Sequence, residues 1–404
     1  MKRAVTKKIS YMNEEGQESS LAVLSYYLHN SDIYKKTRTN TQQKRYAFRE
    51  FLEKECLSAN LGEITNEYID HVADNPTTYG FFSEFFDVPF PNPQHGKRTL
   101  IDLFAGIGGI RLPFNELGYQ CVFSSEWDKY AQQTYFANFG EVPFGDITKE
   151  STKKYIPKKF DLLLAGFPCQ AFSIMGKMKG FADIRGTMFF EVATILKKHQ
   201  PSVVLLENVK QLTTHDHGKT FATILHILNE LGYHIKWNVL NALDFGLPQK
   251  RERVIIVGFR NKRCADAFNF DFESKPYNLL DVLEADNKTS LSLLASDTIL
   301  AKRKLQTKGK KAFYPSIWHE NKAGNVSILD YACALRTGAS YNYLLVNGIR
   351  RPSSRELLRL QGFPDSYKIV VSHGEIRRQT GNSVAVPMIR EIARKIDFIL
   401  DNIQ

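Results

Sequence analysis

Cysteine is scarce in this chain, with five residues among 404. An odd number of widely spaced cysteines argues against a disulfide framework and favours a reducing compartment such as the cytoplasm. Long apolar stretches are also lacking, and residues 1–20 are charged, without the apolar segment of a signal peptide. We find no internal repeat. These absences argue against a disulfide-stapled secreted domain, a membrane-spanning protein and a repeat protein.

Positive charge is in excess, with 54 Lys and Arg against 43 Asp and Glu, a formal net charge of +11. This balance favours a polyanionic partner, although many basic proteins bind nothing acidic. The length is sufficient for two or three domains.

Short apolar runs alternate with helical patterns through the middle of the chain. The runs at 99–104, 121–125, 160–165, 202–206 and 254–259 predict strands. The stretches 129–137, 188–198, 219–231 and 386–401 predict helices. This alternation is typical of a doubly wound α/β domain.

A glycine turn follows the first predicted strand, with Gly106 and Gly108 before a helical stretch. Such a turn lets backbone amides approach a nucleotide closely, although glycine turns are often only structural. The third glycine of the dinucleotide fingerprint is replaced by Arg111, which disfavours a nicotinamide-dependent dehydrogenase.

Three further residues indicate an adenosine site. Glu126 lies twenty residues after Gly106, where a carboxylate can bind two ribose hydroxyls. Trp127 can stack on a base, and Asp146 in the next loop can accept an exocyclic amine. No phosphate-binding lysine accompanies them.

Cys169 follows an apolar strand and a turn containing Gly166 and Pro168. This placement predicts a thiol at the carboxyl end of a strand, where open parallel sheets bind ligands. The alternative is a buried structural cysteine.

Glu207 follows another apolar strand, and a buried carboxylate needs a partner; a helix cap or a surface acid is the alternative. Arg251 and Arg253 alternate into the next strand and so point to one face. They either form a solvated edge or aim at an anionic or carbonyl ligand.

The order and spacing of these pieces resemble the cytosine-5 DNA methyltransferases, above all bacterial modification enzymes that act on short palindromes. The resemblance covers about residues 98–399. The matching blocks are 102–109, 126–128, 145–147, 166–170 with Ser173, 207–209, Gln249 with Arg251 and Arg253, 351–364 and 381–384. It implies a class I S-adenosylmethionine-dependent methyltransferase domain, with a smaller irregular target-recognition domain and an α-helical N-terminal extension.

The resemblance implies a catalytic role for five residues. Cys169 adds to carbon 6 of a cytosine flipped out of duplex DNA, and Glu207 binds or protonates ring nitrogen 3. Arg253 holds oxygen 2, with Arg251 beside it. Asn382 positions the active-site loop and the methionine part of the cofactor. Carbon 5 then receives a methyl group from S-adenosyl-L-methionine.

The resemblance also supplies a cofactor site that needs no metal. Phe104 packs on one face of the adenine, with Ile147 or Trp127 near the other. The remaining cofactor residues are Gly106, Gly108, Glu126, Asp146, Pro168, Asn382 and Ser383.

DNA contacts are expected from two segments. By resemblance, the loop after the nucleophile closes over the duplex with Ser173, Met175, Lys177 and Arg185, and Met175 either wedges into the base stack or packs against the loop. In the irregular region 260–348, a basic run is expected to meet phosphates, and residues 317–343 are expected to read bases. The run consists of Lys302, Arg303, Lys304, Lys308, Lys310 and Lys311.

The expected domains are a helical extension over residues 1–95, the catalytic domain over 96–262, the target-recognition domain and hinge over 263–371, and a C-terminal return over 372–404. The extension contacts DNA, packs or dimerises, or regulates genes; its sequence leaves these open. We expect a cytoplasmic, nucleoid-associated monomer on DNA with no obligatory protein partner, protecting DNA from a restriction endonuclease. The alternatives are a tRNA cytosine-5 methyltransferase and a non-catalytic DNA-binding regulator.

Overall fold

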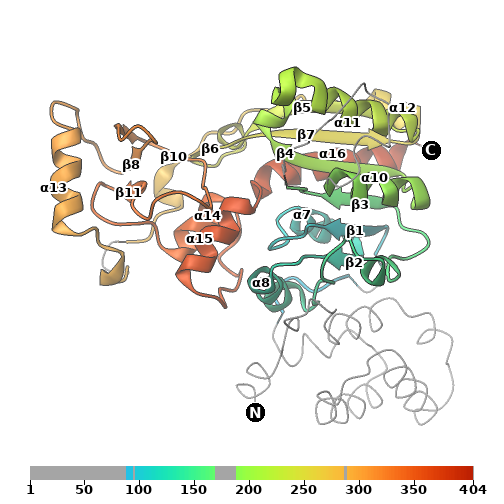
Figure 1. Cartoon of the computed structure of the whole chain (residues 1–404), viewed down its shortest axis with the longest axis horizontal. Helices are drawn as coiled ribbons and strands as arrows, with labels where there is room; N and C mark the ends of the chain where they lie inside the picture. Colours follow the sequence, from blue (N-terminus) through green and yellow to red (C-terminus); the bar gives the residue numbers. More distant parts are fainter. Residues whose placement is uncertain (1–87, 94–95, 169–187, 286–288, 404) are drawn as a thin grey trace, which may run out of the picture. The chain divides into compact units, whose positions relative to one another are not determined.

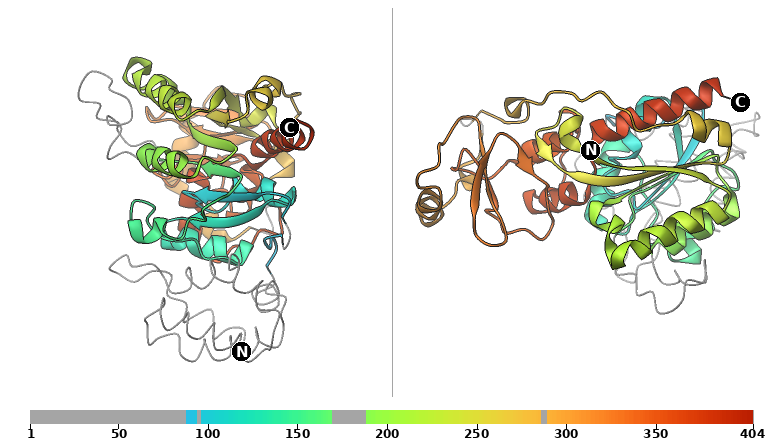
Figure 2. Two further views of the ribbon diagram at one scale, coloured as in Figure 1. Left: turned by 90° about the vertical axis from the view of Figure 1, so that its right-hand side faces the viewer. Right: turned by 90° about the horizontal axis from the view of Figure 1, so that it is seen from above.

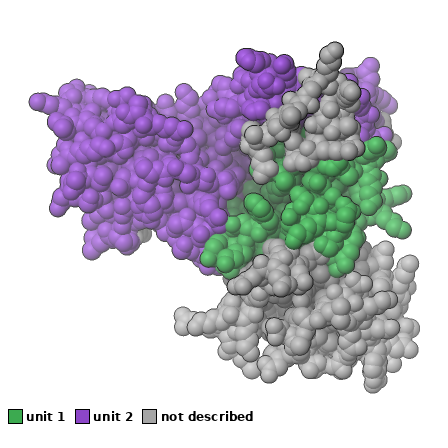
Figure 3. All heavy atoms as spheres, in the orientation of Figure 1, with its two compact units in different colours: residues 1–205 green, residues 206–404 purple. Residues whose placement is uncertain are grey.

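The structure is a computed structural model that describes residues 88–93, 96–168, 188–285 and 289–403 (Figure 1). The chain divides into two compact units, residues 1–205 and 206–404 (Figure 3). The division falls inside strand β4 (Val203–Val209). The four expected domains therefore stay a prediction, as do the helices expected before residue 88, which lie outside the described residues.

A six-stranded sheet with the order β2-β1-β3-β4-β7-β5 forms the centre of the fold. In the first unit, β1 (Thr99–Leu103) pairs in parallel with both β2 (Gln120–Ser125) and β3 (Leu162–Ala165). In the second unit, β5 (His234–Asn241) and β7 (Glu252–Phe259) are antiparallel along their whole length. The predicted α/β fold is confirmed, with an antiparallel strand at one edge.

Four helices were predicted, at 129–137, 188–198, 219–231 and 386–401, and each begins and ends within two residues of a helix in the structure. In the first unit they are α7 (Arg111–Glu116), α8 (Lys129–Phe139), α9 (Glu150–Lys153) and α10 (Met188–His199). In the second unit they are α11 (Lys219–Glu230), α12 (Lys262–Ala267), α13 (Asp297–Gln306), α14 (Ser354–Leu360), α15 (His373–Asn382) and α16 (Val386–Asn402).

Capping and amphipathic patterning explain these helices. Asp128 caps α8 by accepting from the amides of Tyr130 and Ala131, and Gly140 ends it in the left-handed conformation. In α16 the apolar positions recur at helical spacing and are buried. The helices α11 and α16 lie on opposite faces of the β5–β7 pair (Figure 2).

The segment predicted to be irregular contains regular structure. A three-stranded antiparallel sheet has the order β11-β8-β9, with β8 (Ile317–Glu320), β9 (Val326–Leu329) and β11 (Leu344–Val346). Strand β10 (Ala332–Cys333) pairs with β6 (Gln249–Lys250). Strands of two to four residues are too short for an alternating pattern to identify them.

Arg111 explains why the glycine turn departs from the dinucleotide fingerprint. Its guanidinium is fully buried and forms a bidentate pair with Glu141, at 2.8 and 2.7 Å. It also donates to the Tyr135 hydroxyl, which contacts the Asp102 carboxylate at 3.3 Å. The arginine thus anchors α7 within the first unit through a buried polar cluster.

We expect Asp102→Asn to remove a pH-dependent part of the stability. Burial raises the pKa of Asp102 to about 8, against the opposing effects of Arg111 and Tyr135. Protonated Asp102 is therefore favoured in the folded state, and its contribution is complete below the unfolded pKa and is lost as pH rises towards 8. The free energy of unfolding of the wild type should fall over this range, by up to about 1.4 kcal/mol per pH unit.

The Asp102→Asn protein should show a shallower decline when both are unfolded by denaturant at pH 5 to 9. Glu116→Gln, on the same unit, is the control and should keep the wild-type slope. Identical slopes for wild type and Asp102→Asn would show that Asp102 is ionised throughout.

Candidate active site

The turn after β1 has positive φ angles, a backbone conformation that lets a ligand approach the main chain closely. Phe104, Gly106 and Gly108 have φ of 55°, 54° and 76°. A Cβ atom on Gly108 would lie 2.2 Å from the Phe139 ring, so this position requires glycine. A positive φ at a bulky residue such as Phe104 is an outlier of the kind found at binding sites.

Glu126 joins this turn to the end of β2. Its carboxylate is buried and accepts from the amides of Gly106 and Asp128, each at 2.8 Å. Burial raises its pKa, while these two hydrogen bonds act in the opposite direction. The Trp127 amide also lowers this pKa by hydrogen bonding, so about one of the roughly four acceptor positions of the carboxylate remains for a ribose hydroxyl.

The other predicted adenosine residues lie in the first unit as well. Asp146 accepts from the amide and hydroxyl of Thr148 through Oδ1, at 2.9 and 2.8 Å. The Trp127 ring is 73% exposed, whereas Ile147 is buried. Pro168 is exposed just after β3. The hydrogen-bond acceptors of this unit therefore fit an adenosine, with one carboxylate able to accept from a ribose hydroxyl and another able to accept from the amine.

Glu207 lies within β4, two residues before its end, and not after the strand as predicted. Its Oε1 is 2.9 Å from Nε of Arg253, and both side chains are almost buried. Burial raises the pKa of Glu207, and the charges of Arg253 and Arg251 only partly oppose this effect. A carboxyl group in this setting holds a proton closer to neutral pH than an exposed one.

Arg251 serves as a backbone anchor in the structure. It is 1% exposed and donates to the carbonyls of Leu335, Gly381 and Ser383. Burial, with the neighbouring charge of Arg253, lowers its pKa to about 9. Its three acceptors are backbone groups, so Arg251 positions the chain around the site.

Gln249 acts in the same way from β6. Its amide donates to the Leu360 carbonyl at 2.7 Å, and its oxygen accepts from the Leu335 amide at 3.1 Å. Gly381 faces the same segment, since a Cβ there would lie 2.7 Å from the Thr337 nitrogen. Asn382 is exposed at the end of α15, and Ser383 is buried beside it. The alternation of Arg251 and Arg253 indicated a shared face but not these partners.

The predicted DNA-contacting residues divide into two groups. Cys169, Ser173, Met175, Lys177 and Arg185 lie outside the described residues. In the basic run, Lys308 and Lys311 are exposed, whereas Lys310 donates to the Val326 carbonyl.

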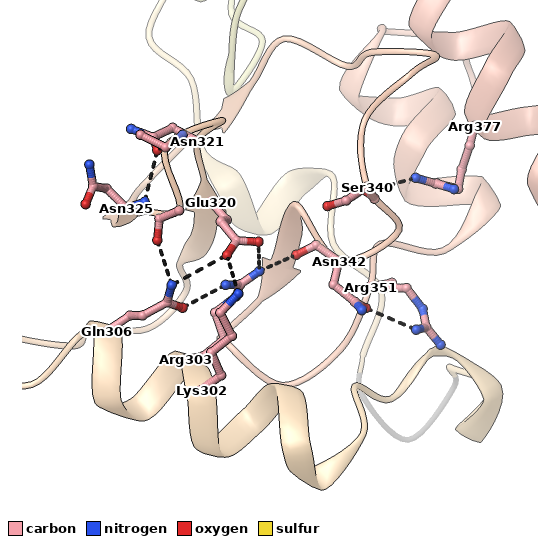
Figure 4. Close-up of polar contacts among 12 residues, drawn as sticks. Lys302, Arg303, Gln306, Glu320, Asn321, Asn325, Ser340, Asn342, Arg351 and Arg377 are labelled. Carbon is pink, nitrogen blue, oxygen red and sulfur yellow. Dashed lines mark hydrogen bonds and ion pairs between the residues drawn. The ribbon is translucent and has the colours of Figure 1, made fainter.

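The run also contains two cations paired within the unit. Lys302 and Arg303 both contact Glu320, at 3.1 and 2.6 Å (Figure 4). These hydrogen bonds lower the pKa of Glu320 to about 2.

The described residues offer neither a cluster of metal ligands nor a membrane-spanning helix. No group of three or more His, Cys, Asp or Glu is placed to hold a metal ion there. No helix in the same ranges has the length and apolarity needed to cross a bilayer.

The α/β fold is that of a class I S-adenosylmethionine-dependent methyltransferase. Residues 98–397 match the family model described as C-5 cytosine-specific DNA methylase. The chain belongs to this family. It is a DNA (cytosine-5)-methyltransferase, and S-adenosyl-L-methionine is its cofactor.

Relatives of known name support this membership. The chain is 56% identical over 296 residues to the Type II methyltransferase M.HaeII of Haemophilus aegyptius, covering 72% of this chain and 91% of the relative. It is 44% identical to M.HpaII of Haemophilus parainfluenzae, covering 83% and 98%. The structure is similar to that of the S. pombe Dnmt2 methyltransferase, with a TM-score of 0.56 and 19% identity over 74% of this chain and 99% of that chain.

Proposed function

We propose that the enzyme is a Type II modification methyltransferase that methylates cytosine within one duplex DNA sequence and so protects that sequence from a partner endonuclease. The relatives M.HaeII and M.NgoBI, each 56% identical, are named Type II methyltransferases. The observation that carries the chemistry is the buried pair of Glu207 and Arg253, because it places a carboxyl group and a guanidinium side by side, 2.9 Å apart.

Nucleophilic addition begins the proposed reaction. The Cys169 thiolate adds to carbon 6 of the flipped cytosine, and the proton of Glu207 neutralises charge at nitrogen 3. Arg253 donates to oxygen 2 of the ring. Carbon 5 is then nucleophilic enough for methylation, and loss of its proton expels the thiolate. Extrahelical binding is required because the stacked base is inaccessible.

The cofactor, when bound, supplies the methyl group. Glu126 accepts from a ribose hydroxyl, Asp146 accepts from the adenine amine, and Phe104 packs on the ring with Ile147 or Trp127 near the other face. Gly106 and Gly108 admit the methionine part, with Pro168, Asn382 and Ser383 close to it. Each assignment rests on the resemblance and on the hydrogen-bond acceptors of the described residues.

Arg251 and Gln249 are proposed as positioning residues, not as groups that touch the base. Both hold the Leu335 backbone, and Arg251 also holds the carbonyls of Gly381 and Ser383. This arrangement couples the segment after β10 to the strand that carries Arg253.

The test is methylation in cells followed by sequencing for 5-methylcytosine. A plasmid that expresses the enzyme should carry the modification at one short sequence, and should resist an endonuclease that cuts there. Scattered modification would contradict site specificity. Modification of tRNA with none on duplex DNA would favour the tRNA alternative. We further propose a cytoplasmic enzyme that acts on DNA as a monomer; gel filtration of the complex should give one protein per duplex.

A further inference from the structure

A pocket in the second unit gathers positive charge without acid. Its lining includes Arg336, Arg351 and Arg377, with Tyr341, Tyr343 and His373. Among the described residues that line it, there is no aspartate or glutamate. The arginines come from three places in the chain: the segment after β10, the segment before α14, and α15. We refer to this site as the arginine pocket.

Neutral groups hold each guanidinium of the arginine pocket. Arg351 donates to Asn342 Oδ1 and to the Leu294 carbonyl, each at 3.2 Å, and Arg377 donates to the Ser340 carbonyl at 3.3 Å (Figure 4). The two guanidiniums also lie 4.8 and 4.1 Å from the centre of the Tyr341 ring. Such contacts orient an arginine but leave its charge uncompensated.

Arg336, the third arginine of the pocket, contacts the other tyrosine, Tyr343. Its guanidinium lies 5.0 Å from the centre of the Tyr343 ring, and its amide donates to the Tyr343 hydroxyl at 3.3 Å. Tyr343 is buried, so the position of Arg336 is defined by a fixed residue.

Neighbouring arginines of the same unit behave differently. Arg303 pairs with Glu320, Arg350 with Glu356, and Arg359 with Asp365, at 2.6 to 2.8 Å. No such pair involves the three arginines of the pocket within the described part of the chain. Three cations without counter-charge are unfavourable together, and an external anion relieves their repulsion.

We propose that the arginine pocket binds a backbone phosphate of duplex DNA, an inference that rests on the proposed DNA substrate. A phosphodiester carries one negative charge and two exposed oxygens, which match the planar donor fork of arginine. Burial and the charges of Arg377 and Arg351 hold the pKa of His373 below its usual value, so this ring adds no fourth cation at neutral pH.

Phosphate binding here would align the DNA with the catalytic groups. Arg377 belongs to α15, which ends at Asn382. Arg336 directly follows Leu335, whose backbone is held by Gln249 and Arg251. Phosphate contacts fix register without reading sequence, so the pocket sets the position of the duplex and not the choice of site.

The test compares Arg336→Gln, Arg377→Gln and the double variant with wild type. Affinity is measured across a salt series for duplexes with and without the methylated sequence. Each lost phosphate contact should lower the salt slope of log affinity by about 0.9, equally for both duplexes. Arg394→Gln is the matched control, because this exposed arginine on α16 already pairs with Glu391; its slope should match wild type.

An unchanged slope in the double variant overturns the proposal. So does a smaller ratio of specific to non-specific affinity with an unchanged slope, which would indicate guanine reading. Wild-type binding of S-adenosylmethionine by each variant confirms folding. Methylation of duplex DNA by the wild-type enzyme is measured alongside, to separate the two inferences. If the wild type does not methylate duplex DNA, the proposed function is contradicted. If it does, and the salt slope of the double variant is unchanged, only phosphate binding by the arginine pocket is contradicted.

A second measurement locates the contact. Neutral methylphosphonate groups are placed one at a time along the duplex. Wild type should lose affinity at one position more than at its neighbours, and the double variant should be insensitive there. Equal sensitivity of both proteins at every position would also overturn the proposal.

Discussion

Cys169→Ser is expected to abolish methyl transfer while binding of DNA and cofactor stays within about tenfold. A free thiol has a pKa of about 8.5, so a thiolate forms close to neutral pH. A serine hydroxyl is nearly isosteric but far too basic to supply the nucleophile. The substitution therefore removes the attacking anion without removing the surface on which substrates bind.

Covalent trapping provides the measurement for Cys169. With 5-fluorocytosine at the target position, wild type should form a DNA adduct that survives denaturation, because fluorine cannot leave as the proton does. The serine variant should form none. Cys264→Ser, at a buried cysteine of α12, should still trap DNA. A covalent adduct formed by the Cys169→Ser variant would contradict the assignment of Cys169 as the nucleophile.

Glu207→Gln is expected to slow the chemical step by about a hundredfold or more, in line with general acid contributions. The raised pKa of Glu207 keeps its proton available towards neutral pH, and the amide of glutamine keeps the size but cannot give up a proton in the same way. Binding of DNA should change much less, since the side chain is almost buried.

Single-turnover rates across pH check the role of Glu207. The thiolate of Cys169 forms as pH rises, whereas the proton of Glu207 is lost as pH rises through its raised pKa. Wild type should therefore show a falling limb on the alkaline side, and the glutamine variant should lack it. Glu252→Gln is the control, because Glu252 forms an exposed pair with Lys210, and its rate should stay within about twofold. A near-wild-type rate for Glu207→Gln would mean a structural role only.

Local patterns were sufficient for most of the α/β framework. Each apolar run between 99 and 259 predicted a strand that the structure contains, because burial on both faces of a sheet leaves a continuous apolar signature. The helical stretches were equally clear, as α16 shows, because buried positions recur at the helical period. The ordered blocks of functional residues were enough to identify the family.

Contacts between distant positions were decided only by the tertiary structure. Nothing local to Arg251 shows that it donates to Ser383, 132 positions further along the chain. Similarly, the sequence alone places Lys302 and Arg303 in a run expected to face DNA, whereas in the structure both pair with Glu320.

The sequence by itself determined most strands and helices of the α/β framework and the family, and it predicted the residues able to do its chemistry. Only the tertiary structure decided which cations are neutralised inside the protein and which are not. Arg111 pairs with Glu141, whereas Arg336, Arg351 and Arg377 meet around two tyrosines with no acid among the described lining residues. The physical reason is that charge compensation depends on distances of a few ångströms between residues far apart in the chain, and such distances leave no periodic trace in the sequence.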